Sequence, residues 1–130
     1  MHRQADHRYR GDEREESDMG WPVSPEGFHE VLTQLDEKHD QSIFVTEHGI
    51  ADRDDTQRGD YIEESIDAMS AAADDGVDVM GYMHWSLLDN VEWDKGRWPR
   101  FGLIEVDYDD MTRTVRDSAE RYADIVAEKS

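Results

Sequence analysis

Glu47 is the first residue whose position could support chemistry. It ends the apolar run "SIFVTE" (residues 42–47), and His48 and Gly49 follow it directly. Two hypotheses fit a carboxylate at a strand end: a side chain solvated by water, or a nucleophile or base held at the rim of a site. A His-Gly turn would permit the sharp change of direction that leaves the carboxylate facing inward. These residues alone leave both hypotheses open.

A second group of candidate residues is aromatic and acidic. Trp85 lies in another apolar run, and the polar loop after it holds Glu92, Trp93 and Trp98. Carbohydrate-binding sites use this composition, because indole faces pack on the apolar C–H face of a pyranose and carboxylates accept hydrogen bonds from paired hydroxyls. The alternative is that the tryptophans cap the end of a sheet without any ligand. Composition favours neither hypothesis.

Three helices are predicted from apolar spacing and capping residues. Ser24 and Pro25 suit the N-cap and first position of a helix. A second helix is expected from about Asp60, which has capping-box spacing to Glu63, and a third from about Ser118. Their predicted inner faces are Phe28, Val31, Leu32 and Leu35; then Ile62, Ile66, Met69 and Ala73; and then Ala119, Tyr122, Ile125 and Val126.

Two buried strands are predicted, one in residues 42–47 and one in the run "VDVMGYMHWSL" (residues 77–87), and residues 101–108 are expected to form a strand or hairpin. The order helix, strand, helix, strand, helix, with strands apolar on both faces, indicates an α/β fold with parallel βαβ organisation. Ligands gather at the carboxyl ends of such strands. Glu47 and Trp85 both lie at those ends, which favours the site hypothesis for Glu47.

Composition limits the classes of function. The 130 residues suffice for one ordinary domain. The chain carries 33 acidic and 14 basic residues, a formal net charge of −19, which argues against binding to nucleic acid or an anionic membrane. Because the acidic residues are spread along the chain, they indicate a solvated surface suited to high salt. The absence of cysteine excludes disulfides and thiolate chemistry.

Residues 1–18 are charged and aperiodic, so we expect them to be disordered or poorly packed, with the domain in residues 19–130. They lack the apolar core of a signal peptide. No window approaches the ~18 consecutive apolar residues of a membrane span. A soluble, cytoplasmic protein is therefore expected. The histidines are scattered and there is no glycine-rich phosphate loop, so neither a metal nor another cofactor is expected.

The segments around the candidate residues resemble one enzyme family. "FVTEHGIAD" followed by "GYMHWSLLDNVEWDKGRWPRFGLIEVDY" is similar to the carboxyl-terminal part of family 1 glycoside hydrolases, the retaining β-glucosidases and β-glycosidases, and in particular to their archaeal, salt-adapted branch. "SDMGWPVSPEGFHEVL" resembles the segment before the family's seventh barrel strand, and "RDSAERYADI" its final helix. The resemblance covers roughly residues 17–127. It implies strands 7 and 8 of a (β/α)8 TIM barrel, with their flanking helices.

The resemblance also implies a role for each candidate residue. Glu47 would be the catalytic nucleophile, which attacks the anomeric carbon and forms a covalent glycosyl-enzyme intermediate. Trp85 would be the platform under the sugar that is cleaved. Glu92 would accept hydrogen bonds from the distal hydroxyls, and the Trp93 indole N–H would donate to one of them. Phe101 would help to line the pocket. A carboxylate at Glu92 would repel a 6-phosphate, which points to unphosphorylated glucosides or galactosides.

Two departures from the family pattern matter. His48 stands where the family has the Asn of a Thr-Glu-Asn-Gly motif; a protonated His48 could stabilise the Glu47 carboxylate, and a neutral one could replace the amide hydrogen bond only in part. The second departure is length, because a (β/α)8 barrel needs about 250 residues. Retaining hydrolysis also needs a second carboxylate about 5–5.5 Å from the nucleophile. The family carries it in an Asn-Glu-Pro motif on the fourth strand, and this sequence has no Asn-Glu-Pro.

The sequence therefore predicts a β-glycosidase that hydrolyses terminal, non-reducing β-linked sugars with retention, in carbohydrate metabolism, and a β-glycoside as its partner. The alternative is a non-catalytic piece of such an enzyme, from a truncated or split gene, or an interaction module. A third hypothesis is an enzyme of two chains, with the missing barrel portion supplied in trans, or a homo-oligomer. We expect the isolated chain to be inactive, since loss of the acid/base typically costs ~10²–10⁴-fold in rate.

Overall fold

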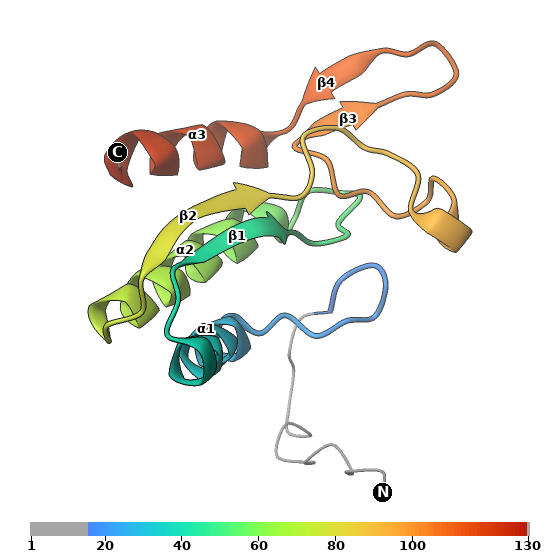
Figure 1. The fold of residues 1–130 in the computed structure, drawn as a ribbon. Coiled ribbons are helices and arrows are strands. Elements are labelled where there is room, and N and C mark those ends of the chain that lie inside the picture. The colour runs from blue at the N-terminus through green and yellow to red at the C-terminus, as the bar shows by residue number, and fades with distance from the viewer. Residues whose placement is uncertain (1–15, 130) are drawn as a thin grey trace, which may run out of the picture.

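A computed structural model describes residues 16–129 of the chain (Figure 1). The prediction that residues 1–18 are disordered falls mostly outside the described residues; residues 16–18 contact the segment after the first strand, where Asp18 N–H donates to the Ala51 carbonyl at 2.8 Å. The elements are α1 (Pro25–His39), β1 (Ile43–His48), α2 (Arg58–Asp74), β2 (Val79–His84), the 3-10 helix η2 (Trp93–Lys95), β3 (Ile104–Val106), β4 (Arg113–Val115) and α3 (Asp117–Lys129).

β1 and β2 form a parallel pair connected by α2, which confirms the predicted βαβ organisation. The helices lie on one side of this pair, with α2 behind the strands and α1 and α3 flanking it (Figure 1). Two apolar clusters fill the space between the strands and the helices. One is centred on Ile62, Ile66, Leu103 and Ile125, and the other on Leu32, Ala72 and Val77.

The prediction that both strands are buried on both faces is wrong for the described residues. Phe44 of β1 is 44% exposed, and Met80 and Met83 of β2 are 68% and 54% exposed. The described helices pack against the other face of the strand pair, so no described residue covers these side chains. The sequence pattern correctly shows a strand that is apolar on both faces, but within residues 16–129 only one of these faces is covered.

The helix predictions are confirmed in type and corrected in detail. α1 begins at Pro25, and the Ser24 hydroxyl accepts from the Gly27 N–H at 3.2 Å, as an N-cap does. The predicted inner faces include too many residues, because fewer positions of each helix are buried than the apolar pattern indicates. Leu32 and Ile125 are buried, whereas four other predicted inner residues are exposed: Val31, Leu35, Ala73 and Val126.

α2 begins two residues earlier than predicted, at Arg58, and the predicted capping box does not form. The Asp52 carboxylate, from the preceding loop, instead accepts hydrogen bonds from the backbone N–H groups of Gln57 and Arg58, at 2.8 and 2.9 Å. Asp60 and Glu63 both pair with Arg121 of α3. Their charges thus connect two helices rather than cap one.

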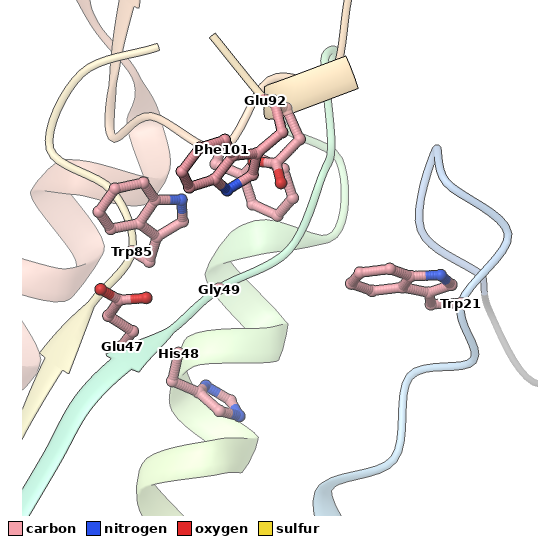
Figure 2. A pocket seen from close by; sticks show the side chains of 8 residues that line it. Trp21, Glu47, His48, Gly49, Trp85, Glu92 and Phe101 are labelled. Carbon is pink, nitrogen blue, oxygen red and sulfur yellow. The ribbon is translucent and has the colours of Figure 1, made fainter. Parts of the chain in front are cut away.

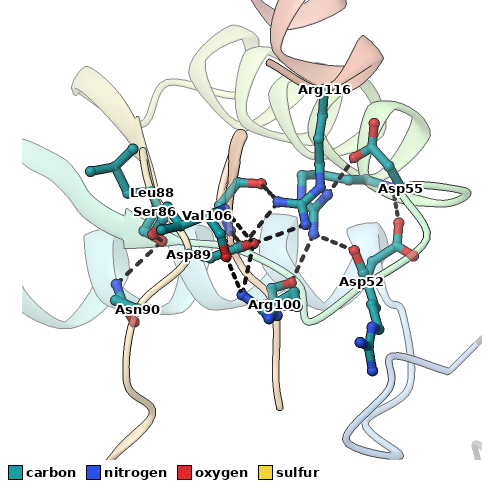
Figure 3. Close-up of polar contacts among 12 residues, drawn as sticks. Asp52, Asp55, Ser86, Leu88, Asp89, Asn90, Arg100, Val106 and Arg116 are labelled. Atoms are coloured by element: carbon teal, nitrogen blue, oxygen red, sulfur yellow. Dashed lines mark hydrogen bonds and ion pairs between the residues drawn. The ribbon is translucent and has the colours of Figure 1, made fainter. Parts of the chain in front are cut away.

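The prediction of a strand or hairpin in residues 101–108 is confirmed as a single strand, β3, which pairs antiparallel with the unpredicted β4, with Ile104 opposite Val115. A buried ionic cluster around Asp89 joins the β3–β4 hairpin to the loop after β2 (Figure 3). The Arg116 guanidinium donates to both oxygens of Asp89, at 2.9 and 3.0 Å, and the Gly102 N–H donates to the same carboxylate at 2.9 Å. Asp89 is 1% exposed. The loop between β2 and β3 is thereby joined to Arg116, the residue directly before α3.

Candidate active site

A pocket of about 340 Å³ lies at the carboxyl ends of β1 and β2 (Figure 2). It brings together all five residues that the sequence predicts for the site. Trp98, the remaining tryptophan of the loop after β2, does not line it. The lining residues are Trp21, Glu47, His48, Gly49, Trp85, Glu92, Trp93 and Phe101.

Glu47 lies on an irregular part of β1. Val45 pairs with Tyr82 and His48 pairs with His84, so three steps along β1 match two along β2. Such a bulge redirects side chains and is common beside active sites. The Glu47 carboxylate is exposed and points toward Trp85 (Figure 2). None of the residues in the range 16–129 donates a hydrogen bond to it, so its oxygens can accept from a ligand.

Gly49 has a different structural role from the predicted one. Its φ is not positive, so the turn does not require glycine for its backbone angles. A Cβ at this position would instead lie 1.8 Å from the Trp85 carbonyl oxygen. The Trp85 N–H also donates to the His48 carbonyl at 2.9 Å. The missing side chain thus allows the ends of β1 and β2 to approach closely and places Glu47 beside Trp85.

The loop after β2 presents the other side of the pocket. The Glu92 N–H donates to the Gly96 carbonyl at 2.8 Å and the Lys95 N–H donates to the Glu92 carbonyl at 2.7 Å, which closes a tight turn. At the tip of this turn Trp93 is 90% exposed, with φ at +33°, a value that non-glycine residues seldom adopt. The turn therefore holds an indole ring in contact with solvent beside the Glu92 carboxylate.

Phe101 forms a buried wall of the pocket, at 7% exposure, and its position depends on the ionic cluster behind it. Burial by itself would raise the pKa of Asp89, but the hydrogen bonds from Arg116 and from the Gly102 N–H outweigh burial and hold the pKa below its usual value. Asp89 is therefore an anion that organises the segment carrying Phe101. It does not line the pocket, and its charge is already paired.

His48 faces away from Glu47 and lies among aromatic rings (Figure 2). Its ring stacks on Phe28 and Tyr61, with centroid distances of 4.4 and 4.9 Å. The Tyr82 hydroxyl lies 3.1 Å from Nδ1, and the Tyr61 hydroxyl lies 3.1 Å from Nε2. Burial lowers the pKa of His48 to about 4, so the ring is neutral near pH 7. Both ring nitrogens face tyrosine hydroxyls and the ring points away from Glu47, so this geometry gives no support to the hypothesis that a protonated His48 stabilises the Glu47 carboxylate.

Trp21 lines the pocket and was not predicted from the sequence. It is 62% exposed and lies across the pocket from Trp85 (Figure 2). A turn positions it, because the Ser17 N–H donates to the Trp21 carbonyl at 2.9 Å. A tryptophan in a polar segment before a helix was a usable signal, but nothing in its spacing linked it to residues more than twenty positions away.

Comparison with known proteins identifies the family: the model for glycosyl hydrolase family 1 matches residues 2–130, and the chain belongs to that family. It is 44% identical over 109 residues to a β-galactosidase of Saccharolobus solfataricus, covering 84% of this chain and 22% of the relative. It is 37% identical over 118 residues to a 1,4-β-D-glucan glucohydrolase of Thermotoga neapolitana, covering 83% of this chain and 27% of the relative.

Solved structures agree with this assignment. The crystal structure of a hyperthermophilic β-glucosidase from Pyrococcus furiosus superposes with a TM-score of 0.88 at 39% identity, over 90% of this chain and 25% of that one. A β-glucosidase from Thermotoga maritima, in complex with glucoimidazole, gives a TM-score of 0.83 at 34% identity over 90% of this chain and 29% of that one. The chain therefore has the fold of one part of a family 1 TIM barrel and spans about a quarter of its relatives' length.

Within residues 16–129 no cluster of three or more His, Asp or Glu side chains has a geometry suited to a metal ion. None of the helices in the same range combines the length and the hydropathy that a bilayer crossing requires.

Proposed function

We propose that this chain supplies the nucleophile and part of the sugar-binding surface of a retaining β-glycosidase. Glu47 would attack the anomeric carbon of a terminal, non-reducing β-glycoside, and the C–O bond to the leaving group would break as the glycosyl-enzyme ester forms. The observation that carries this proposal is the convergence of Glu47, Trp85, Glu92, Trp93 and Phe101 on one pocket. The β-galactosidase and glucohydrolase relatives support the same class of reaction.

The pocket is suited to an uncharged sugar. The Trp85 indole, 37% exposed and facing Glu47, offers an apolar surface for the C–H face of a pyranose. Glu92 can accept hydrogen bonds from two hydroxyls, and the Trp93 indole N–H can donate one. Glu92 and Glu47 together make the pocket acidic, so a phosphorylated sugar would be repelled. We therefore propose unphosphorylated β-glucosides or β-galactosides as substrates.

The second carboxylate of the reaction would come from polypeptide outside this chain. Among the described residues Glu92 is the other carboxylate that lines the pocket, and its proposed partner is a sugar hydroxyl rather than the leaving group. We propose that β1 and β2 are strands 7 and 8 of the barrel. The partner of the chain would then be the preceding six strands, in the same protein or in trans. The exposed Phe44 and Met83 side chains support this proposal, since a closed barrel would cover them.

A second candidate function is a non-catalytic interaction module. The observation in its favour is the same uncovered face of the strand pair, which could bind another polypeptide without any reaction. A parallel two-strand pair also leaves two unpaired edges, which readily accept a further strand. The two functions differ in what they require of Glu47, because only catalysis needs this side chain.

Covalent trapping tests the catalytic proposal. A 2,4-dinitrophenyl 2-deoxy-2-fluoro-β-glucoside forms the glycosyl-enzyme without a general acid, because dinitrophenolate leaves unprotonated. The chain would be treated in 0.1 M and in molar salt, alone and mixed with the first three-quarters of a family 1 relative. We expect a fluoroglucosyl adduct on Glu47 by peptide mass spectrometry, fastest in the mixture and at high salt, where screening relieves the repulsion among acidic residues.

Matched variants complete this test. Glu47→Gln should take up no reagent, while Glu64→Gln, which removes an exposed carboxylate from α2, should be labelled like the unmodified chain. An adduct on another residue, or no adduct in either mixture or salt, would exclude Glu47 as the nucleophile. Turnover of a nitrophenyl β-glucoside by the chain alone would contradict the expectation that the isolated chain is inactive.

A further inference from the structure

We propose that His48 is a positioning residue for Glu47, whose imidazole fixes the carboxyl end of β1 to α2 through Tyr61 and to β2 through Tyr82. This inference rests on the proposed role of Glu47 as nucleophile. It concerns the residue at which the sequence departs from the family motif. The reasons are the irregular strand, the hydrogen bonding of the ring and the length of the histidine side chain.

The strand itself cannot fix the direction of Glu47. The regular pairing of β1 with β2 is interrupted between Val45 and His48, which leaves Glu47 on the bulge. Its carboxylate has no hydrogen-bond donor among the described residues. The direction of the Glu47 side chain therefore depends on how firmly the residues on either side are held. His48, directly after it, has the most extensive contacts of these neighbours.

The hydrogen bonds of His48 use both ring nitrogens. A neutral imidazole offers one N–H donor and one acceptor nitrogen. One of the hydroxyls of Tyr61 and Tyr82 must therefore donate to the ring and the other must accept from it. Burial raises the pKa of Tyr61 to about 12 and also raises that of Tyr82, so both hydroxyls keep their protons. The stacked Phe28 ring restricts tilting of the imidazole.

The length of the side chain matters. In asparagine the amide atoms are one bond from Cγ, as Nδ1 is in histidine, whereas Nε2 is one bond further out. Asparagine at position 48 can therefore replace the bond to Tyr82 but cannot reach Tyr61. Glutamine has the opposite property, because its amide atoms match Nε2 in reach. Histidine reaches both tyrosines at once, and each hydroxyl comes from a different element of the fold.

These geometries define a test on the 130-residue chain in molar salt. The first measurement is the order parameter of the Glu47 backbone amide by ¹⁵N relaxation. We expect about 0.85 in the unmodified chain and a fall toward 0.6 in Tyr61→Phe, Tyr82→Phe and His48→Asn. Tyr61→Phe should add nothing to His48→Asn, since that bond is already lost, and Tyr82→Phe should add nothing to His48→Gln.

Tyr122→Phe is the matched control, because Tyr122 packs against Tyr82 and His84 but does not contact His48. It should lower the thermal midpoint without changing the order parameter at Glu47. An unchanged order parameter in Tyr61→Phe and Tyr82→Phe, or a fall of equal size in Tyr122→Phe, would overturn the positioning role.

The second measurement is the rate of trapping at Glu47 with the dinitrophenyl fluoroglucoside, in the presence of the complementary barrel portion. We expect a loss on the order of tenfold in Tyr61→Phe and Tyr82→Phe, because small errors in the position of a reacting group are costly. Equal rates in all variants would overturn the inference while leaving the nucleophile in place. Failure to label the unmodified chain would overturn the proposed function, whereas the order parameters would still decide whether His48 fixes this strand end.

Discussion

Asp89 and Glu47 are two carboxylates at the same end of the strand pair, yet their surroundings are opposite. Asp89 is 1% exposed and accepts hydrogen bonds from Arg116 and from the Gly102 N–H. Glu47 is exposed, and no described residue donates to it. A carboxylate whose bonds are all made within the protein has no capacity left for a substrate. The difference separates the residue that builds the site from the residue that is available for chemistry.

The largest expected effect comes from breaking the Asp89 cluster. Asp89→Ala should lower the free energy of unfolding by about 3–5 kcal/mol, because Arg116 would then be a buried charge without its carboxylate partner. Urea unfolding followed by tryptophan fluorescence measures this change. Arg121→Ala removes the two exposed ion pairs with Asp60 and Glu63 and serves as the control, with an expected loss of less than about 1 kcal/mol. Equal losses in the two variants would show that burial gives the Asp89 cluster no special importance.

The same comparison explains which parts of the molecule could be predicted from the sequence. Glu47, Trp85 and Glu92 were predicted because local motifs carry them, and strand ends bring such motifs together. The cap on α2 was missed because Asp52 comes from the preceding loop rather than from within the helix. Trp21 was missed for a similar reason, since only the folded chain brings it across from Trp85.

Burial was predicted less well than element type. An apolar side chain such as Met83 predicts that its strand face is covered, but the sequence pattern does not identify the residues that cover it. The role of His48 was also beyond sequence reasoning. Its partners Phe28, Tyr61 and Tyr82 come from three different elements, so no spacing rule connects them.

A change of pH should have a medium effect on the free energy of unfolding. The contributions of His48 and of the Asp89 cluster should be lost in different pH ranges. The pKa of His48 is about 4 in the folded chain, against an ordinary value of 6.5. Between these values the unfolded chain binds more protons, so stability is complete above pH 6.5 and falls as the pH decreases toward 4. Loss of the Asp89 interactions on acidification requires a lower pH, because the pKa of that carboxyl lies below its usual value.

The measurement is the free energy of unfolding at pH 7 and pH 5 for the unmodified chain and for His48→Gln. The unmodified chain should lose about 2 kcal/mol more than the variant over this interval. His84, whose pKa burial also lowers to about 4, is present in both proteins, so the part of its contribution that comes from burial cancels. Identical pH dependence in the two proteins would mean that His48 is not buried as a neutral ring in solution.

The smallest effect on stability is expected at Glu47, and it completes the comparison with Asp89. Glu47→Gln keeps the size of the side chain and breaks no hydrogen bond within residues 16–129, so the free energy of unfolding should change by less than about 0.5 kcal/mol. It should even rise slightly, because one charge is removed from a chain of net charge −19. Urea unfolding of Glu47→Gln beside Asp89→Asn measures both. A loss at position 47 as large as that at position 89 would mean that Glu47 is held by the fold, as Asp89 is, and is not a group left available for substrate.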